Sequence, residues 1–229
     1  MSKTLLVAGF GPGISTAVAE KFGKEGFSIA LVARNAERLQ AGVQALQGKS
    51  IQAAAFPADL ASPAAIAPLI ESVRRKLGRL GAVHWNAYGG GAGDLLSADL
   101  GEVRGLFEIP ILSLLSAVRA ALPDLRQQKD AAVLVTNGGL GLFDDQMDAL
   151  AVEWGAMGLA VANSAKHKLV RVLAQKLKPE GIYVGEVMVL GLVKGTPWDQ
   201  GNATVDPSAV AEKFWALYRG RSQLGVTIP

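Results

Sequence analysis

The opening of the chain constrains the fold more than any other stretch. An apolar run ends at Ala8, a turn with glycines at positions 9, 11 and 13 follows, and a helical pattern begins at Ile14. Glycine permits positive φ and lets a backbone approach a phosphate closely. The next helix points its free N–H groups and the positive end of its dipole at the turn. The stretch therefore predicts the strand, turn and helix of a βαβ unit that receives a dinucleotide pyrophosphate.

Apolar runs alternate with helical patterns along the rest of the chain. After a first strand that ends at residue 8, strands are predicted at 27–33, 51–56, 82–87, 131–136, 183–189 and 225–228. Helices are predicted at 14–23, 35–47, 62–78, 100–128, 150–177 and 207–219, with loops at 137–148 and 190–206. Pro110 should kink or break the first of the two long helices.

This alternation implies a parallel sheet covered by helices on both faces. We therefore predict an α/β fold: one doubly wound, Rossmann-like domain over residues 1–229, with a mostly parallel seven-stranded sheet between helix layers.

Composition excludes several classes of protein. Half of the 229 residues are hydrophobic and 19% are charged, so the chain is not disordered. It has no cysteine, which removes disulfides, thiolate nucleophiles and cysteine-ligated metals. The net charge of +3 is mild and spread out, so we expect no nucleic-acid partner. We expect no membrane segment, no leader and a cytoplasmic location. Asp144, Asp145 and Asp148 indicate a helix cap rather than a metal site.

The end of the second predicted strand bears on cofactor choice. A nicotinamide cofactor without a 2′-phosphate usually meets an acidic residue there. The chain has Arg34 at this point and no carboxylate in Ala33-Arg34-Asn35-Ala36. An arginine pairs well with a phosphate, so NADP(H) is favoured over NAD(H). The alternative is that Arg34 is a surface residue that opens a helix.

At this point the chain resembles the short-chain dehydrogenase/reductase family over nearly its whole length. The opening turn looks like that family's T-G-x-x-x-G-x-G, with Ala8 and Ser15 in place of the first threonine and the last glycine. The resemblance implies contacts to the adenine ring from Asp59-Leu60 and a cleft wall at Asn86-Ala87. The candidate cofactor-binding residues are Gly9, Gly11, Gly13, Ile14, Arg34, Asp59, Leu60, Asn86, Ala87, Asn163 and Thr196.

The family's reaction transfers hydride between a nicotinamide and a carbonyl or alcohol. It uses a tyrosine as acid and base, a lysine four residues later, a serine and an asparagine. The resemblance puts Leu159 at the tyrosine, Asn163 at the lysine, Gly138 at the serine and Pro110 at the asparagine. The usual mechanism is therefore not expected.

Three other residues are weak candidates for catalysis. Tyr88 follows the fourth predicted strand, Asn137 adjoins the lost serine, and Lys166 lies three residues beyond Asn163 on the same helix. The structural alternatives are a cleft wall for Tyr88, a strand-end turn for Asn137 and a solvated surface position for Lys166.

Two functional hypotheses follow. The first is an NADP(H)-binding oxidoreductase that acts on a small carbonyl or alcohol through a non-standard active site. The second is a catalytically inactive NADP(H)-binding sensor or partner subunit. A protein that binds no nucleotide is a third possibility. By analogy with the family we also expect a homodimer or homotetramer, formed through the helices at 100–128 and 150–177.

Overall fold

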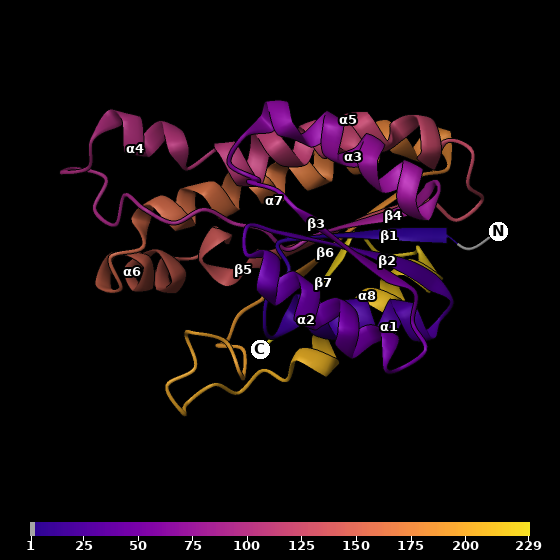
Figure 1. Ribbon diagram of the computed structural model, residues 1–229. Helices are drawn as coiled ribbons and strands as arrows, with labels where there is room; N and C mark the ends of the chain where they lie inside the picture. The colour runs from indigo at the N-terminus through magenta and orange to yellow at the C-terminus, as the bar shows by residue number, and fades with distance from the viewer. Residues whose placement is uncertain (1–2) are drawn as a thin grey trace.

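A single parallel sheet forms the centre of the molecule (Figure 1). The computed structural model describes residues 3–229, and within that range seven strands lie in the order β3-β2-β1-β4-β5-β6-β7. All neighbouring strands pair in parallel, so the predicted doubly wound fold is confirmed. The strands are β1 Lys3–Ala8, β2 Phe27–Ala33, β3 Ala53–Pro57, β4 Leu80–Trp85, β5 Ala132–Gly138, β6 Tyr183–Val189 and β7 Gly225–Ile228.

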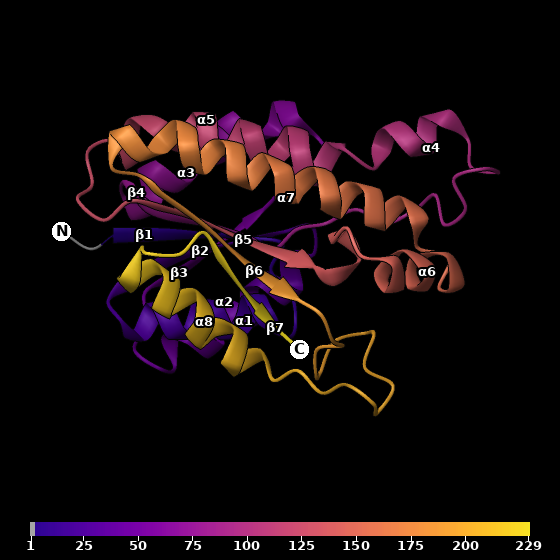
Figure 2. The ribbon, with the colours of Figure 1, turned by 180° about the vertical axis from the view of Figure 1, so that it is seen from behind.

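Helices cover both faces of this sheet. In Figures 1 and 2, α3, α5 and α7 lie on one face, and α1, α2 and α8 lie on the other. The α-helices are α1 Ile14–Lys24, α2 Ala36–Gln47, α3 Pro63–Leu77, α4 Leu100–Gly105, α5 Leu114–Leu125, α6 Asp145–Glu153, α7 Met157–Leu177 and α8 Pro207–Gly220. A π-helix spans Glu108–Ser113, and short 3₁₀ turns span Gly139–Gly141 and Lys178–Glu180.

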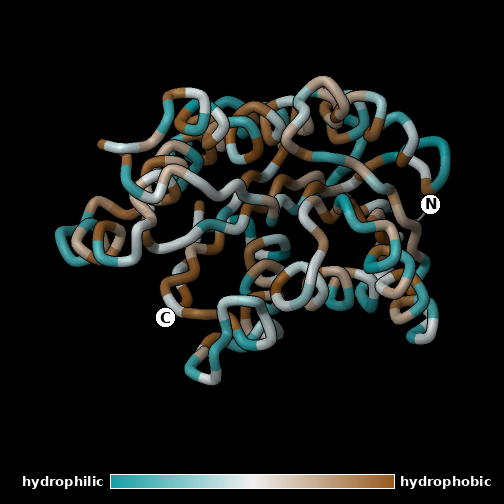
Figure 3. Tube along the Cα trace, turned by 60° about the vertical axis from the view of Figure 1, so that its left-hand side comes forward, coloured by the Kyte–Doolittle hydropathy of each residue, from teal (hydrophilic) through white to brown (hydrophobic). Residues whose placement is uncertain are grey.

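The central strands are mostly apolar because both of their faces are covered. On β1, Leu5 and Val7 pack toward α1 and α8, whereas Leu6 and Ala8 pack toward α3 and α5. Figure 3 shows the result: hydrophobic segments follow the strands, and hydrophilic segments gather on the outer turns and helix surfaces. The two halves of the core thus fix the sheet between its helix layers.

The order of the strands reverses between β1 and β4. The chain moves outward from β1 to β2 and β3, and then returns to β4 on the other side of β1. In sheets of this kind, ligands bind beside such a switch point, at the carboxyl ends of the strands. The glycine-rich turn follows β1 at this edge.

The first of the two long predicted helices is interrupted as expected. Pro110 lies in the π-helix that separates α4 from α5, because proline cannot supply the backbone hydrogen bond that a continuous helix needs there. By length and composition alone, the wider stretch Leu100–Leu125 is long and apolar enough to cross a membrane. In the fold, α5 packs on the sheet through residues such as Leu114, Val118 and Leu125.

The prediction of one helix over 150–177 is wrong. Helix α6 begins earlier, where the Asp144 side chain accepts hydrogen bonds from the amides of Gln146 and Met147. The chain then breaks at Gly155, which has a φ of +56°. Helix α7 starts at Met157, whose amide donates to the carbonyl of Gly93. The predicted loop at 137–148 therefore holds a 3₁₀ turn and the start of a helix.

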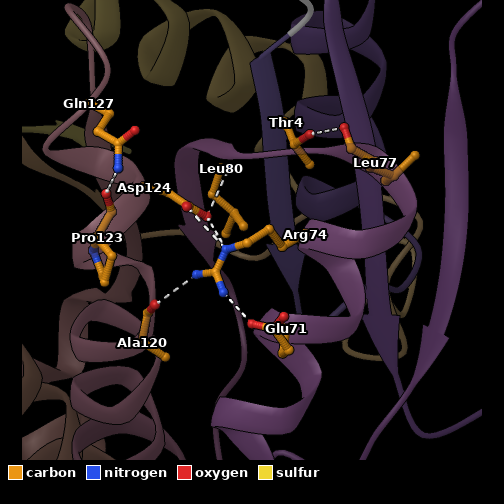
Figure 4. Close-up of polar contacts among 9 residues, drawn as sticks. All are labelled: Thr4, Glu71, Arg74, Leu77, Leu80, Ala120, Pro123, Asp124 and Gln127. Carbon is orange, nitrogen blue, oxygen red and sulfur yellow. Dashed lines mark hydrogen bonds and ion pairs between the residues drawn. The ribbon is translucent and has the colours of Figure 1, made fainter.

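A polar clamp fixes the edge of the sheet opposite the glycine-rich turn (Figure 4). Arg74 on α3 donates through Nε to both carboxylate oxygens of Asp124 on α5, at 3.1 and 3.0 Å. The amide of Leu80, at the start of β4, donates to the same carboxylate at 3.2 Å. Because Asp124 is buried, this clamp holds α3, α5 and β4 in one arrangement.

Candidate functional site

The glycine-rich turn has the backbone geometry that close contact with a phosphate requires. Gly9 and Gly13 have φ values of +84° and +89°, which side chains rarely allow. A Cβ on Gly9 would lie 2.6 Å from the Ala87 nitrogen, and one on Gly13 would lie 2.7 Å from Thr196 Cγ2. Gly11 faces open space, with no atom within 4 Å of a Cβ built there. The turn is therefore tight at its two ends and open in the middle, as a pyrophosphate cradle needs to be.

The turn is braced from the helix that follows. The Ser15 hydroxyl accepts a hydrogen bond from the Gly11 amide at 2.9 Å and donates to the Gly11 carbonyl at 3.0 Å. Thr16 donates to the same carbonyl at 2.7 Å. The serine that replaces the family's third glycine is fully buried, so its hydroxyl stabilises the turn rather than facing a ligand. Ile14, the first residue of α1, is buried in the core.

Arg34 is exposed at the carboxyl end of β2 and makes no ion pair with any residue in 3–229. The next residue, Asn35, caps α2 by accepting a hydrogen bond from the Arg38 amide at 2.7 Å. Arg38 is also exposed, and it brings a second guanidinium to the first turn of α2. Arg38 is absent from the predicted cofactor residues, although the sequence shows it four residues after Arg34.

The other predicted cofactor residues lie at the same edge of the sheet. Asp59 is exposed after β3 and accepts from the Ala61 amide at 3.0 Å, and Leu60 is buried beside it. The backbone N–H of Asn86 extends the β1–β4 pairing by donating to the Ala8 carbonyl at 2.9 Å. Ala87 then packs against the glycine-rich turn. The structure thus brings the strand-end residues together.

The loop at 190–206 lies over this edge. Thr196 touches the glycine-rich turn, and its hydroxyl donates to the Val193 carbonyl at 2.8 Å. Trp198 donates through its indole N–H to the Tyr88 hydroxyl at 3.0 Å. Both aromatic side chains are at least half exposed. Tyr88 is therefore joined to the loop at 190–206, and half of its surface is exposed.

Among the residues that the resemblance places at the family's catalytic positions, Gly138 and Asn163 lie side by side. A Cβ on Gly138 would lie 2.9 Å from Asn163 Nδ2, so the Asn163 amide lies where a serine side chain would begin. Leu159 precedes Asn163 by four residues on α7, so the two share a face of that helix. Pro110 is buried within the π-helix. None of these four side chains carries a hydroxyl or a basic nitrogen.

Asn137 is a structural group. Its Nδ2 donates to the Asn163 carbonyl at 3.0 Å and to Glu186 Oε1 at 2.8 Å, and its Oδ1 accepts from the Gly138 amide. With both amide hydrogens engaged, the side chain has no donor left for a substrate. Glu186 on β6 is also buried and pairs with His167 on α7. In the sequence, Glu186 stands out as an acidic residue inside the apolar strand 183–189, but no functional or structural role is predicted for it.

Lys166 is buried rather than solvated, with 2% of its surface exposed. It makes no hydrogen bond or ion pair within the part of the chain that the structure describes. Burial lowers the pKa of Lys166 to about 8, against the opposing effect of the Glu186 charge. It lies one turn deeper on α7 than Asn163, in the layer between α7 and the sheet.

Comparison with known proteins agrees with this arrangement. The sequence model of the short chain dehydrogenase family matches residues 3–204. The meso-2,3-butanediol dehydrogenase of Serratia marcescens is 26% identical over 186 residues, which are 81% of this chain and 70% of that protein.

Solved structures match over almost the whole chain. A short chain dehydrogenase from Burkholderia cenocepacia in complex with NADP has a TM-score of 0.85 and 25% identity, and covers 99% of this chain and 96% of its own. An NADPH-bound short chain oxidoreductase from Pseudomonas aeruginosa, which contains an atypical catalytic centre, has a TM-score of 0.85 and 21% identity, and covers 99% and 95%. Because the family match runs from β1 through the loop that follows β6, and takes in the turn and the strand ends described above, the chain belongs to the short chain dehydrogenase family.

Proposed function

We propose that the protein is an NADP(H)-dependent oxidoreductase that acts on a small carbonyl or alcohol through a non-standard active site. The observation that carries the proposal is the open, positive-φ turn at Gly9 and Gly13, together with the unpaired Arg34 at the adjoining strand end. The turn would hold the pyrophosphate at the N-terminus of α1, and Arg34 would pair with the 2′-phosphate. NADP or NADPH in the Burkholderia and Pseudomonas relatives supports the same choice.

When bound, NADPH supplies a hydride. The chain's own residues then decide where the proton comes from. Leu159 and Gly138 provide no proton donor at the positions where the family has its acid and its serine. A positioned general acid contributes about 10²- to 10⁴-fold to such reactions. Reduction of an isolated ketone should therefore be slow, with its proton taken from water or from a non-standard residue, whereas quinones and enones depend less on an acid.

The cofactor proposal is tested by direct titration of the wild-type protein with NADPH and with NADH. NADPH should bind more tightly than NADH, because only NADPH carries a 2′-phosphate that can pair with Arg34. Arg34→Glu should weaken NADPH binding by at least about 10- to 100-fold, the range of a lost charge-assisted hydrogen bond, and should not weaken NADH binding. Arg75→Glu, at an exposed position on α3, is the matched control and should change neither.

Equal affinity for the two cofactors, or an Arg34→Glu protein that still prefers NADPH, would refute the specificity argument. If neither cofactor binds, the nucleotide-free interaction protein becomes the better description.

The second candidate is an NADP(H)-binding sensor or partner subunit without turnover. It is favoured by one observation: the Asn163 side-chain amide occupies the space next to Gly138, at two of the positions where the family has catalytic residues. A panel of ketones, quinones and enones separates the two proposals. Steady NADPH oxidation with any member supports the oxidoreductase, and tight NADPH binding with no turnover across the panel supports the sensor.

A further inference from the structure

A cationic hollow of about 380 Å³ lies at the end of the sheet opposite the glycine-rich turn. It is formed where β1 and β2 begin, just before β5, and where α8 ends. The six residues of β1 separate it from the turn by roughly 20 Å. Among its lining residues are Lys3, Asp130, Trp215, Tyr218, Arg219 and Arg221.

Positive charge exceeds negative charge around this hollow. Lys3 Nζ pairs with Asp130 Oδ2 at 2.8 Å. The hydrogen bond from Lys3 holds the pKa of Asp130 below its usual range, and the Lys3, Arg221 and Arg219 charges lower it further against the opposing effect of burial. Glu25 also lines the hollow, but it pairs with Lys21 at 3.2 Å.

The two guanidinium groups are held by an aromatic pair. Trp215 and Tyr218 stack with their ring centroids 5.3 Å apart. Arg219 lies 6.0 Å from the Trp215 ring and Arg221 lies 5.4 Å from the Tyr218 ring. Contact with an aromatic face orients a guanidinium without using its N–H donors. The aromatic contacts therefore use none of the N–H donors of the two guanidinium groups.

Arg221 carries the decisive observation. It follows α8 with a φ of +51°, an unusual conformation for a residue other than glycine. Its Nε donates to the Tyr218 carbonyl at 3.3 Å, which caps the helix end. Its Nη2, however, is buried and has no hydrogen-bond partner in the described chain. Helix capping explains the Nε contact and leaves the Nη2 donors unexplained, and a buried charged donor is costly to leave unpaired.

We propose that this hollow is a second binding site, which takes the phosphate or carboxylate group of a small anion through Arg221, with Arg219 and Lys3 adding charge. The planar guanidinium fork matches the oxygens of such a group. The volume is at the low end of the range for small-molecule sites, so the anion is small. The site does not depend on the cofactor proposal, because no residue is shared between them.

Titration with inorganic phosphate at constant ionic strength tests the site, with side-chain N–H signals of Arg221 and Trp215 followed by NMR. These signals should shift together and saturate at one phosphate per chain. Arg221→Gln should weaken the affinity at least about tenfold, the effect of losing a charge-assisted hydrogen bond. Arg75→Gln removes the same charge from the exposed surface of α3 and should leave the affinity unchanged.

Arg219→Gln provides a second variant in case Arg221→Gln fails to fold, and it should also weaken binding. Glycerol 3-phosphate distinguishes the source of the group: tighter binding than inorganic phosphate assigns the hollow to a phosphate ester, and equal binding assigns it to the free ion. Shifts that never saturate, or equal loss in Arg75→Gln and Arg221→Gln, overturn the proposal. Phosphate that binds only at the glycine-rich turn would leave the Arg221 signal unmoved and would overturn it as well.

Discussion

Alanine at position 138 tests whether Gly138 and Asn163 depend on each other. The φ of Gly138 is −107°, which alanine adopts without strain, so the substitution isolates a steric effect. The new Cβ would lie 2.9 Å from Asn163 Nδ2, closer than real Cβ contacts allow. Overpacking of this kind costs about 1–3 kcal/mol. Because an amide can rotate away, Gly138→Ala should cost about 1–2 kcal/mol of the free energy of unfolding.

The double variant gives the sharper result. Asn163→Ala removes the amide, so the methyl group of Ala at 138 finds open space. The double variant should therefore lose less free energy of unfolding than the two single variants lose together, and the difference should be about 1–2 kcal/mol. Urea unfolding of the four proteins, followed by far-UV circular dichroism, measures this difference. Gly105→Ala is the matched control, since a Cβ there meets no atom within 4 Å, and it should add to Asn163→Ala within about 0.5 kcal/mol. Additive losses for the 138 and 163 pair would refute the reasoning.

Three further expectations concern the rest of the molecule. Arg74→Ala should lower the free energy of unfolding by about 3 kcal/mol in urea, since it leaves buried Asp124 without its cation, whereas Arg75→Ala should change it by less than about 0.5 kcal/mol; equal effects would contradict the role of the clamp. Burial lowers the pKa of Lys166 from 10.5 to about 8. Between about pH 8 and pH 10.5, Lys166 is therefore protonated in the unfolded chain and neutral in the folded protein, and stability rises with pH. The wild type should gain about 3 kcal/mol relative to Lys166→Met as pH rises through that window, and parallel stability curves would contradict this. Val161→Glu, on an exposed apolar position of α7, should dissociate the proposed homodimer or homotetramer in analytical ultracentrifugation, and a monomeric wild type would rule that assembly out.

The sheet could be predicted because each central strand is buried on both faces. Such strands read as short, continuous apolar runs, and their separation by helical patterns leaves few alternatives to a parallel sheet. The glycine-rich turn could be located for a related reason: Gly9 and Gly13 need positive φ, which few other residues tolerate. Local chemistry decides both features, so a single sequence reveals them.

The break between α6 and α7 could not be predicted in the same way. A glycine inside a helical pattern costs only about 1 kcal/mol, and Gly155 looks like many that are tolerated. The distant loop after β4 decides the outcome, because the carbonyls of Ala92 and Gly93 accept the amides of Gly158 and Met157 and so start a new helix. The burial of Lys166 and the engagement of Asn137 likewise depend on β6, which follows them in the chain.

Four residues around the end of β5 form one packed, hydrogen-bonded group: Gly138, Asn163, Asn137 and Glu186. Because Gly138 has no side chain, the Asn163 side-chain amide fits beside it. Asn137 Nδ2 donates hydrogen bonds to the backbone carbonyl of Asn163 and to Glu186 on β6. Restoring a single family residue would therefore not rebuild the usual site, because Gly138→Ser alone would meet Asn163. The same packing keeps the Asn137 donors away from a substrate, because Asn163 and Glu186 engage both of them.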